Sequence, residues 1–481
     1  MKEKSIKKNY ILNVAYQILT IIVPFITTPY ISRVLQAEGV GAYSYTLAIA
    51  SYIGVFATVG MDVYGQLQTA KCRDDRSACG KLVGGIFMAK LVTTSVTISI
   101  YFILEPQIGM YGNLYWIMIL YFLSILMDFT WFFEGMEEFA YIVGRNILVK
   151  GAGIVLIFIF VRDISDVGIY AIIMQGTVLA GNLLVIPYLC KFIKWIPIFQ
   201  LKIGTHLKGG IIYFVPTIAT SVYTMLDKAM IGWVTKSAYE NGYYEQAYKI
   251  VQMALIVVTS LRTVTLPRVV RLYSEKQYNE VKDMVDNSIR FVLCFSLPMC
   301  IGLMVVAPQL IPVFLGEGYE KCIYIVQILS VLIVVLGLSN LISGQCLTAT
   351  GKQKQANICV IVGAIINFII NLILIPRYGA LGATIATVCA ETIIMLMFLA
   401  FGSEYLKMNK IGKNFVRYFL CSLIMAAVIY GLKKMGLQEE ILLLCEVLVG
   451  VIAYFTELVI IRDDLVCSFI YSIKEKFNKR G

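Results

Sequence analysis

Stretches of roughly 20 apolar residues recur along the whole chain, and they constrain its fold more than any other feature. A helix of about that length crosses the ~30 Å hydrocarbon core of a bilayer. With 59% hydrophobic and 15% charged residues and a mean hydropathy of +0.79, the composition is too apolar for a soluble enzyme. We therefore predict an all-α integral membrane protein with fourteen transmembrane helices. The predicted spans are residues 9–32, 42–64, 82–104, 113–132, 147–161, 167–189, 210–234, 248–266, 287–314, 323–349, 358–376, 380–401, 415–432 and 441–461.

The distribution of Lys and Arg predicts the orientation of these spans. If the chain starts in the cytoplasm, 31 of the 41 Lys and Arg lie in or next to segments placed inside, and 7 lie in segments placed outside. Both termini are therefore expected to be cytoplasmic. The first span is too long for a signal peptide, so we expect it to be a retained helix. The net charge of +11 suits a face against anionic lipids and requires no nucleic acid.

The residue inventory excludes several kinds of chemistry. His206 is the only histidine, so a Ser-His-Asp triad or a multi-histidine metal centre is excluded. The 12 cysteines form no CxxC pair, and no GxxxxGK[ST] phosphate loop is present. We therefore predict no metal, no cofactor and no ATP hydrolysis. Coupling to a proton or sodium gradient stays open.

A basic connector divides the chain into two halves of six spans each. It covers residues 191–209, where lysines alternate with Trp195, Ile198 and Phe199, and it is predicted to lie in the membrane surface. The alternative is an ordinary solvated loop. The segments "AEGVGAYSY" (37–45) and "YENGYYEQAY" (239–248) resemble each other, which favours two parallel repeats. The predicted domains are an N-terminal bundle (1–190), the connector (191–209), a C-terminal bundle (210–402), and helices 13 and 14 with a basic tail (403–481).

Lys90 is an ionisable residue near the middle of the third predicted span. Such a residue costs roughly 2.5–3.5 kcal/mol at the bilayer centre and usually faces a protein interior or a cavity. Thr93, Thr94 and Thr97 follow at helical spacing, so the lysine heads a polar face that is predicted to point inward. The alternative is that the hydroxyls only pack helices and that Lys90 pairs with a carboxylate.

Other charged residues lie in spans of both halves. Asp227 and Lys228 are adjacent in the seventh span, beside a polar strip within residues 217–224. Lys228 could extend to the outer headgroups, but this would not explain Asp227. Glu391 lies in the middle of the twelfth span, and Lys249 begins the eighth. We expect these residues to face a shared cavity.

Four stretches resemble the polysaccharide flippases of the MOP exporter superfamily, of the O-antigen and capsule type. They are "YQILTIIVPFITTPYISRVLQAEGVGAYSY" (16–45), "AKCRDDRS" (70–77), "DFTWFFEGMEEFAYIVGRNILVK" (128–150), and "LDKAMIGWV" with "ENGYYEQAYKI" (226–250). The resemblance implies a MATE-like fold of two pseudo-symmetric six-helix bundles in a V, with helices 13 and 14 added. It also implies alternating access and a substrate, an oligosaccharide linked by pyrophosphate to a polyprenyl lipid, that moves from the inner to the outer leaflet.

The family motif Asp-x-x-Trp-Phe-Phe-x-Gly-x-Glu falls on Asp128, Trp131 and Glu137, and the resemblance implies a role at the inner gate. Glu134 departs from the basic or amide residue that the family often has there. A pyrophosphate inside a membrane needs cations that replace its hydration. The predicted substrate-binding cations are Arg33, Lys90, Arg145, Lys228 and Lys249. Asp227 and Glu391 are predicted to couple ions or to balance a neighbouring cation.

Three alternatives remain. A cation-coupled multidrug exporter of the same superfamily would have the same fold, but it should prefer an acidic or neutral aromatic cavity. A membrane glycosyltransferase or polymerase would need larger outer loops than this chain has. A scaffold for cell-wall synthesis would leave the intramembrane charges without a purpose. The predicted partners are therefore the lipid-linked oligosaccharide, membrane lipids and polysaccharide-assembly proteins.

Overall fold

The computed structural model describes most of the chain. It leaves out residues 1–5, 105–108, 195–196, 198–202, 437 and 469–481, and the side chains of 6–21, 139, 215–224, 263–264 and 435. The predicted interfacial residues Trp195, Ile198 and Phe199 lie outside the described residues, as do the side chains of the polar strip at 217–224.

Every regular element in the described part is helical, which confirms the all-α class. Twelve described helices are long and apolar enough to cross a membrane, so the protein is a multi-pass membrane protein. The count of fourteen stays a prediction. Helix α1 (Ile6–Thr58) contains the first two predicted spans, which meet at a kink at Gln36 (φ 54°) where we expected a loop. Helix α10 (Ile203–Thr235) covers the seventh span but is not among the twelve.

The chain divides into two compact units, an N-terminal unit (residues 1–245) and a C-terminal unit (246–481). The boundary falls inside α11 (Ala238–Ser274), so the first two turns of α11 belong to the N-terminal unit together with α10. The predicted domain limits and the two-bundle arrangement stay predictions.

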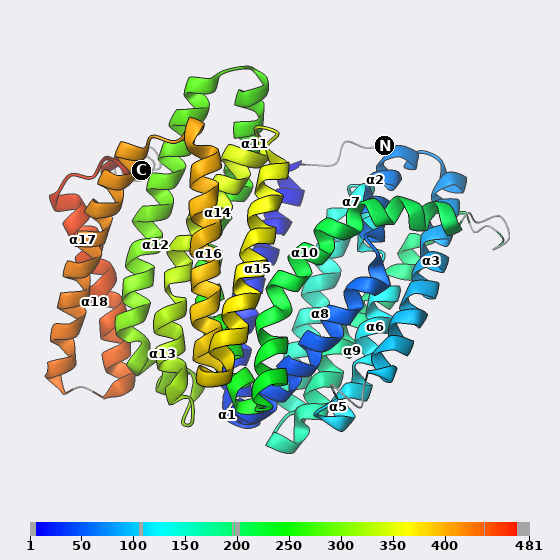
Figure 1. The fold of residues 1–481 in the computed structure, drawn as a ribbon, viewed down its shortest axis with the longest axis horizontal. Helices are drawn as coiled ribbons and strands as arrows, with labels where there is room; N and C mark the ends of the chain where they lie inside the picture. The colour runs from blue at the N-terminus through cyan, green and yellow to red at the C-terminus, as the bar shows by residue number, and fades with distance from the viewer. Residues whose placement is uncertain (1–5, 105–108, 195–196, 198–202, 437, 469–481) are drawn as a thin grey trace, which may run out of the picture. The chain divides into compact units, whose positions relative to one another are not determined.

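The N-terminal unit has α2 and α7 at one end and α5 at the other (Figure 1). Its fourth predicted span is broken into three short helices, because the α-helix is interrupted at Met118 and again before Thr130. The remaining elements are α2 (Met61–Cys72), α3 (Arg76–Ile103), α5 (Gly112–Ile117), α6 (Ile119–Leu126), α7 (Thr130–Gly135), α8 (Phe139–Phe160), the short η1 (Ile164–Asp166) and α9 (Val167–Leu189).

Two buried aromatic clusters hold this unit together. One surrounds Tyr101 and Tyr115, whose rings stack with their centroids 3.8 Å apart. The other surrounds Trp131, Phe132 and Phe133 of α7, which pack on α2, α3 and α9. Inside a membrane such rings stabilise the unit through close packing, because lipid tails are as apolar as the protein interior. The second cluster fixes the position of α7 against α3.

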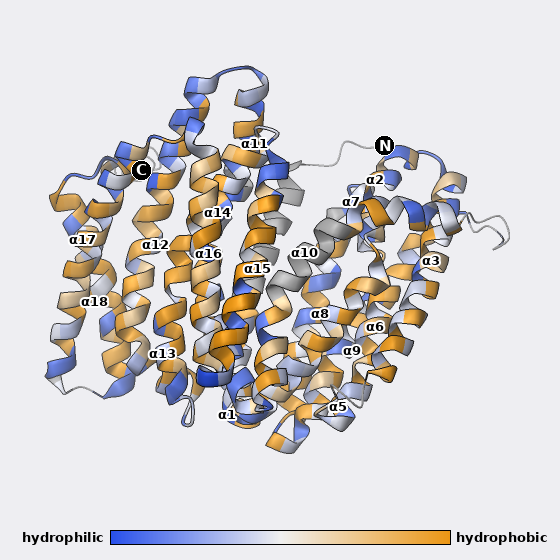
Figure 2. Cartoon of the chain, in the orientation of Figure 1, coloured by the Kyte–Doolittle hydropathy of each residue, from blue (hydrophilic) through white to orange (hydrophobic). Residues whose placement is uncertain are grey.

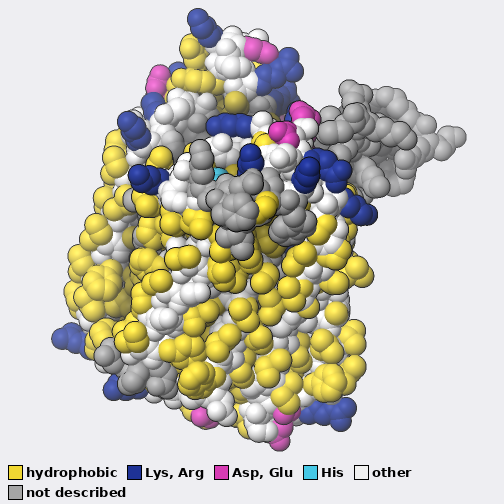
Figure 3. Space-filling model, turned by 90° about the vertical axis from the view of Figure 1, so that its right-hand side faces the viewer, with side chains coloured by type: hydrophobic (Ala, Val, Ile, Leu, Met, Phe, Trp, Pro, Cys, Tyr) yellow, Lys and Arg dark blue, Asp and Glu magenta, His cyan; other side chains and the backbone are white. Residues whose placement is uncertain are grey.

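The C-terminal unit consists of long helices that are apolar along their length and more hydrophilic at their ends (Figure 2). Ile365, Leu420 and Leu448 are each more than half exposed, as expected of side chains that face lipid. Figure 3 shows a similar band of hydrophobic side chains on one face of the molecule, with Lys and Arg gathered at its ends. Besides most of α11, the elements are α12 (Tyr278–Leu315), α13 (Glu320–Leu329), α14 (Val331–Ile342), η3 (Ser343–Thr348, a π-helix), α15 (Gln353–Tyr378), α16 (Ala380–Gly402), η4 (Ser403–Tyr405), α17 (Met408–Leu432), η5 (Lys433–Met435) and α18 (Glu439–Ile460).

One buried carboxylate joins three parts of this unit. Oδ2 of Asp463, just after α18, accepts hydrogen bonds from Arg290 of α12 (2.9 Å) and from Arg417 and Tyr418 of α17 (3.0 and 3.1 Å). Burial alone would raise the pKa of the Asp463 carboxyl, but these donors hold it below its usual value. Asp463 therefore fastens the last two long helices to α12.

Candidate functional site

Lys90 is the most deeply buried charged residue of the predicted site. Its side chain is 2% exposed, and its Nζ lies 2.5 Å from Oδ1 of Asp62 on α2. The ammonium group also donates to the backbone carbonyls of Ile125 and Asp128, each at 3.4 Å. A buried cation must be paired or neutralised, and these oxygens provide the pairing. The predicted alternative, that Lys90 pairs with a carboxylate, therefore describes the structure correctly.

The Asp128–Trp131 motif builds the wall against which Lys90 is held. Oδ1 of Asp128 accepts the backbone N–H of Thr130 at 2.8 Å, an Asx turn that leads into α7. The carbonyl of Asp128 accepts the indole N–H of Trp131 at 3.1 Å and also faces Lys90. The indole lies against Gly65 of α2, where a Cβ would approach the ring to 2.4 Å. The motif thus positions α2 and α7 around the Lys90–Asp62 pair.

The polar face beyond Lys90 points into the protein, as predicted. Thr94 and Thr97 are each 1% exposed, and the hydroxyl of Thr93 donates to the carbonyl of Ala57 at 2.6 Å. Among the described residues, the hydroxyl of Thr94 has no hydrogen-bond partner. The threonines therefore pack α3 against α1 and leave one buried polar group available next to the ion pair.

A second ion pair joins α10 to the start of α11 within the N-terminal unit. Nζ of Lys228 lies 2.6 Å from Oε2 of Glu245, and the hydroxyl of Ser44 donates to the same oxygen at 2.9 Å. Asp227 instead accepts a hydrogen bond from the hydroxyl of Tyr244 at 2.8 Å. The adjacent acid and base of α10 therefore have different partners, and Lys228 does not need to reach the headgroups.

The two segments that resemble each other in the sequence pack against one another. A Cβ on Gly41 would lie 1.7 Å from the carbonyl oxygen of Ala238, and a Cβ on Gly242 would lie 1.9 Å from that of Ala37. Each segment thus contributes an Ala-x-x-x-Gly pattern, and the contact is reciprocal, as in small-xxx-small helix crossings. These glycines are required by the close approach of the two backbones, which lies next to the Lys228–Glu245 pair.

Three other predicted residues of the N-terminal unit are Arg145, Glu137 and Arg33. Arg145 of α8 donates to the amide oxygens of Asn146 and Asn182, the latter at 3.0 Å. Glu137 is exposed, has φ 59°, and lies 3.6 Å from Arg73. Arg33 is exposed on α1. Of the predicted cations, Lys90 is therefore the one that the structure brings together with Asp128 and Trp131.

Lys249 and Glu391 belong to the C-terminal unit. Lys249 is half-buried on α11, and Glu391 is 6% exposed on α16 near Thr387. Neither residue shares a unit with Lys90 or Lys228. Their predicted roles in substrate binding and coupling stay predictions.

Sequence reasoning missed the two carboxylates that neutralise the lysines. Asp62 lies in the second predicted span, so its position in an apolar run was a signal comparable to that of Lys90. Glu245 lies within residues 239–248, the segment that resembles 37–45, so its negative charge could also be read from the sequence. The spacing of residues in the sequence shows which side chains share a face of one helix. Both ion pairs join two different helices, so spacing could not reveal them.

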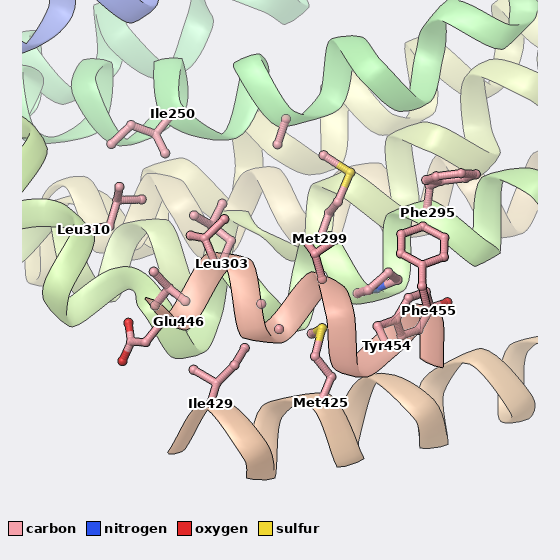
Figure 4. A pocket seen from close by; sticks show the side chains of 17 residues that line it. Ile250, Phe295, Met299, Leu303, Leu310, Met425, Ile429, Glu446, Tyr454 and Phe455 are labelled. Carbon is pink, nitrogen blue, oxygen red and sulfur yellow. The ribbon is translucent and has the colours of Figure 1, made fainter. Parts of the chain in front are cut away.

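The C-terminal unit contains an apolar cavity of about 370 Å³. Met299, Leu303 and Phe455 face it from α12 and α18, and Glu446 lies at one side (Figure 4). The carboxylate oxygens of Glu446 are buried and have no hydrogen-bond partner among the described residues.

The described residues bring no three His, Cys, Asp or Glu side chains together that could hold a metal ion.

A family model described as polysaccharide biosynthesis protein matches residues 6–273, which is more than half of the chain. The chain belongs to this family. The MatE model matches residues 214–373. The predicted placement among the polysaccharide flippases of the MOP superfamily is thereby confirmed.

Curated relatives match most of the chain at low identity. A putative O-antigen transporter of Escherichia coli is 23% identical over 82% of this chain and 97% of its own length. The capsular polysaccharide biosynthesis protein CapF of Staphylococcus aureus is 20% identical over 82% of this chain and 98% of its own length. A probable low-salt glycan biosynthesis flippase of Haloferax volcanii is 23% identical over 50% of this chain and 51% of its own length.

Solved structures of similar fold come from two transporter groups. The lipid II flippase MurJ, in an inward closed conformation, has a TM-score of 0.75 at 18% identity and covers 95% of this chain and 99% of its own. An inward-facing MATE multidrug transporter has a TM-score of 0.59 at 14% identity, covering 82% of this chain and 98% of its own. The predicted MOP-type helical fold is therefore confirmed, whereas these similarities do not identify the cargo.

Proposed function

We propose that the protein is a flippase that moves a polyprenyl-pyrophosphate-linked oligosaccharide from the inner to the outer leaflet of the bacterial cytoplasmic membrane. Both termini would lie in the cytoplasm, and access would alternate between the two sides. The family, and the relatives named as O-antigen transporter and glycan flippase, support a cargo of lipid-linked sugars. The same names favour a transporter over a glycosyltransferase or polymerase.

The observation that carries the proposal is the ion pair between the buried Lys90 and the partly exposed Asp62. A pyrophosphate has no hydration inside hydrocarbon, so it requires a cation there. Lys90 is 2% exposed and its charge is already balanced by a carboxylate 2.5 Å away. A phosphate oxygen could take the place of Asp62, because both are anionic oxygens that accept from an ammonium group. Lys228 with Glu245 offers the same exchange at a second position.

This exchange also gives the carboxylates a role in the empty protein. Without cargo, an unpaired buried ammonium would cost several kcal/mol, and Asp62 and Glu245 remove that cost. In this scheme Asp62 and Glu245 have the charge-balancing role that we predicted for Asp227 and Glu391. Arg33, Arg145 and Lys249 would contact the pyrophosphate or the sugars at other stages, and proton or sodium coupling stays open.

Reconstituted vesicles test the proposal. Purified protein would be assayed for leaflet exchange of a panel of polyprenyl-pyrophosphate oligosaccharides, with and without proton and sodium gradients. We expect Lys90→Met to reduce exchange roughly 10–150-fold, since one charge-assisted contact contributes about 1.5–3 kcal/mol. Lys90→Arg, which keeps the charge, and Lys276→Met, at an exposed position of the C-terminal unit, are the controls. Full exchange by Lys90→Met protein that is folded in the vesicles would refute this role.

A cation-coupled multidrug exporter is the second candidate, because the MatE model matches residues 214–373. Such a protein would move lipophilic cations and would not need Lys90. Gradient-driven uptake of a fluorescent organic cation, unchanged in Lys90→Met, together with no exchange of lipid-linked sugars, would favour this candidate.

A further inference from the structure

A second cavity, of about 420 Å³, lies in the N-terminal unit between α2, the start of α3 and the start of α10. It is distinct from the Lys90 site and plays no part in the proposed transport step. The polar residues that line it are Tyr64, Gln68, Lys71, Lys81, Thr205 and His206.

Helical spacing explains why α2 presents three of these side chains together. Tyr64, Gln68 and Lys71 lie at positions i, i+4 and i+7, so they share one face of α2. Val63 and Leu67 lie on the neighbouring face and are 43% and 45% exposed. Exposed apolar side chains in a membrane protein indicate contact with lipid. The cavity therefore opens beside a surface suited to hydrocarbon.

The cavity contains two cations that the described part of the protein does not neutralise. Lys71 and Lys81 are exposed and form no ion pair with a described residue. The nearby carboxylate of Asp75 is engaged by the backbone N–H groups of Ser77 and Ala78, at 2.7 and 3.1 Å, where it caps α3. The lysines are therefore available to an external anion.

His206 lines the cavity and contacts both α2 and α3. Its Nδ1 lies 3.3 Å from the hydroxyl of Tyr64, and its ring packs so closely on Gly85 that a Cβ there would lie 2.4 Å from Cδ2. Burial lowers the pKa of the His206 imidazole, so the ring is neutral at pH 7 and can donate or accept one hydrogen bond. Together with Gln68 and Thr205 it lines the cavity with neutral polar groups.

We propose that this cavity binds the phosphate group of an anionic membrane lipid. Two ammonium groups and several neutral donors suit a phosphate, and a free phosphate ion offers the same chemistry. The exposed Val63 and Leu67 favour the lipid, because its acyl chains would pack on them while the headgroup enters the cavity. The site is one for a resident lipid and does not depend on the identity of the cargo.

The test compares wild-type protein with Lys71→Gln/Lys81→Gln in detergent. Native mass spectrometry would measure binding of short-chain phosphatidylglycerol, with phosphatidylcholine and inorganic phosphate as separate arms. Both lysines are exposed, so the double variant should fold, which its melting temperature would verify. Lys276→Gln/Lys354→Gln, at two exposed positions of the C-terminal unit, removes the same net charge elsewhere.

We expect phosphatidylglycerol affinity to fall by tenfold or more in Lys71→Gln/Lys81→Gln and by less than twofold in the control. A second variant, Gln68→Leu, should weaken binding severalfold without any change of charge. Equal loss in the control variant would mean that binding follows only net charge and would overturn the proposal. Lysine-dependent binding of inorganic phosphate without binding of the lipid would overturn the assignment to a lipid.

Discussion

The reciprocal contact between residues 37–41 and 238–242 makes a sharp prediction about Gly41→Ala. The new Cβ would lie 1.7 Å from the carbonyl oxygen of Ala238 and 2.6 Å from the backbone nitrogen of Gly242. Carbon–oxygen contacts normally begin near 3.3 Å, so the two backbones must separate by roughly 1.6 Å. A backbone oxygen cannot rotate away as a side chain can. Overpacking of this kind costs about 1–3 kcal/mol.

The control for this prediction is Gly144→Ala on α8, where a Cβ would meet nothing within 4 Å. Replacing a helical glycine by alanine in open space stabilises by about 0.5–1 kcal/mol. The two variants gain the same helix propensity, so the free energy of unfolding should differ between them by the overpacking cost alone, about 1–3 kcal/mol.

Two measurements check the difference. Thermal unfolding in detergent should give a lower melting temperature for Gly41→Ala than for Gly144→Ala. Hydrogen exchange at backbone amides of residues 37–46 should become about 5–150-fold faster in Gly41→Ala, as expected for a local change of 1–3 kcal/mol. If both variants melt alike and exchange in this segment is unchanged, the close crossing does not exist as described.

Three further predictions concern buried charges. Asp62→Asn leaves Lys90 buried without its anion and should destabilise the protein by about 1–3 kcal/mol. This cost is smaller than that of breaking a fully buried pair, because Asp62 is 41% exposed. The double variant Asp62→Asn/Lys90→Met should recover most of the lost melting temperature, and no recovery would contradict the pairing. Glu446→Gln should raise the melting temperature at pH 7, because it removes a buried carboxylate that has no hydrogen-bond donor among the described residues. The expected gain in the free energy of unfolding is roughly 1 kcal/mol or more. A melting temperature below that of the wild type would show that the carboxylate has a partner. Asp463→Asn should lower stability by about 1–3 kcal/mol at neutral pH. The folded pKa of Asp463 is below its usual 3.8. Its contribution to the free energy of unfolding is therefore complete above pH 3.8 and disappears as the pH falls through the folded pKa. The stabilities of the wild type and Asp463→Asn should therefore converge in acid and stay different at neutral pH.

The amino-acid sequence predicted the fold class and the inward direction of the Lys90 face, because both follow from properties of single helices. Hydropathy identifies a span, and helical spacing places Thr94 and Thr97 beneath Lys90. The same reasoning predicted a loop at 33–41, where the structure instead has helix on both sides of a kink at Gln36. A single residue with positive φ has no hydropathy signal.

Partners across helices were the other part that could not be predicted. Lys228 forms its ion pair with Glu245, although Asp227 is adjacent in sequence, because neighbouring residues on a helix point in different directions. The similarity of residues 37–45 to 239–248 was visible as composition, but nothing in it indicated that the two segments touch. Contact between repeats depends on the packing of whole helices.

The Lys90–Asp62 pair also sets how membrane voltage would act on the protein. Opposite charges 2.5 Å apart sum to zero, so displacing the pair together requires no electrical work, whereas one net charge requires about 2.3 kcal/mol per 100 mV. In the proposed cycle the unloaded protein could then reorient without opposing the potential, and only the anionic load would sense it. Vesicles held at defined potentials should show voltage dependence in outward movement of cargo and little in the return. Equal dependence in both directions would mean that the pair separates.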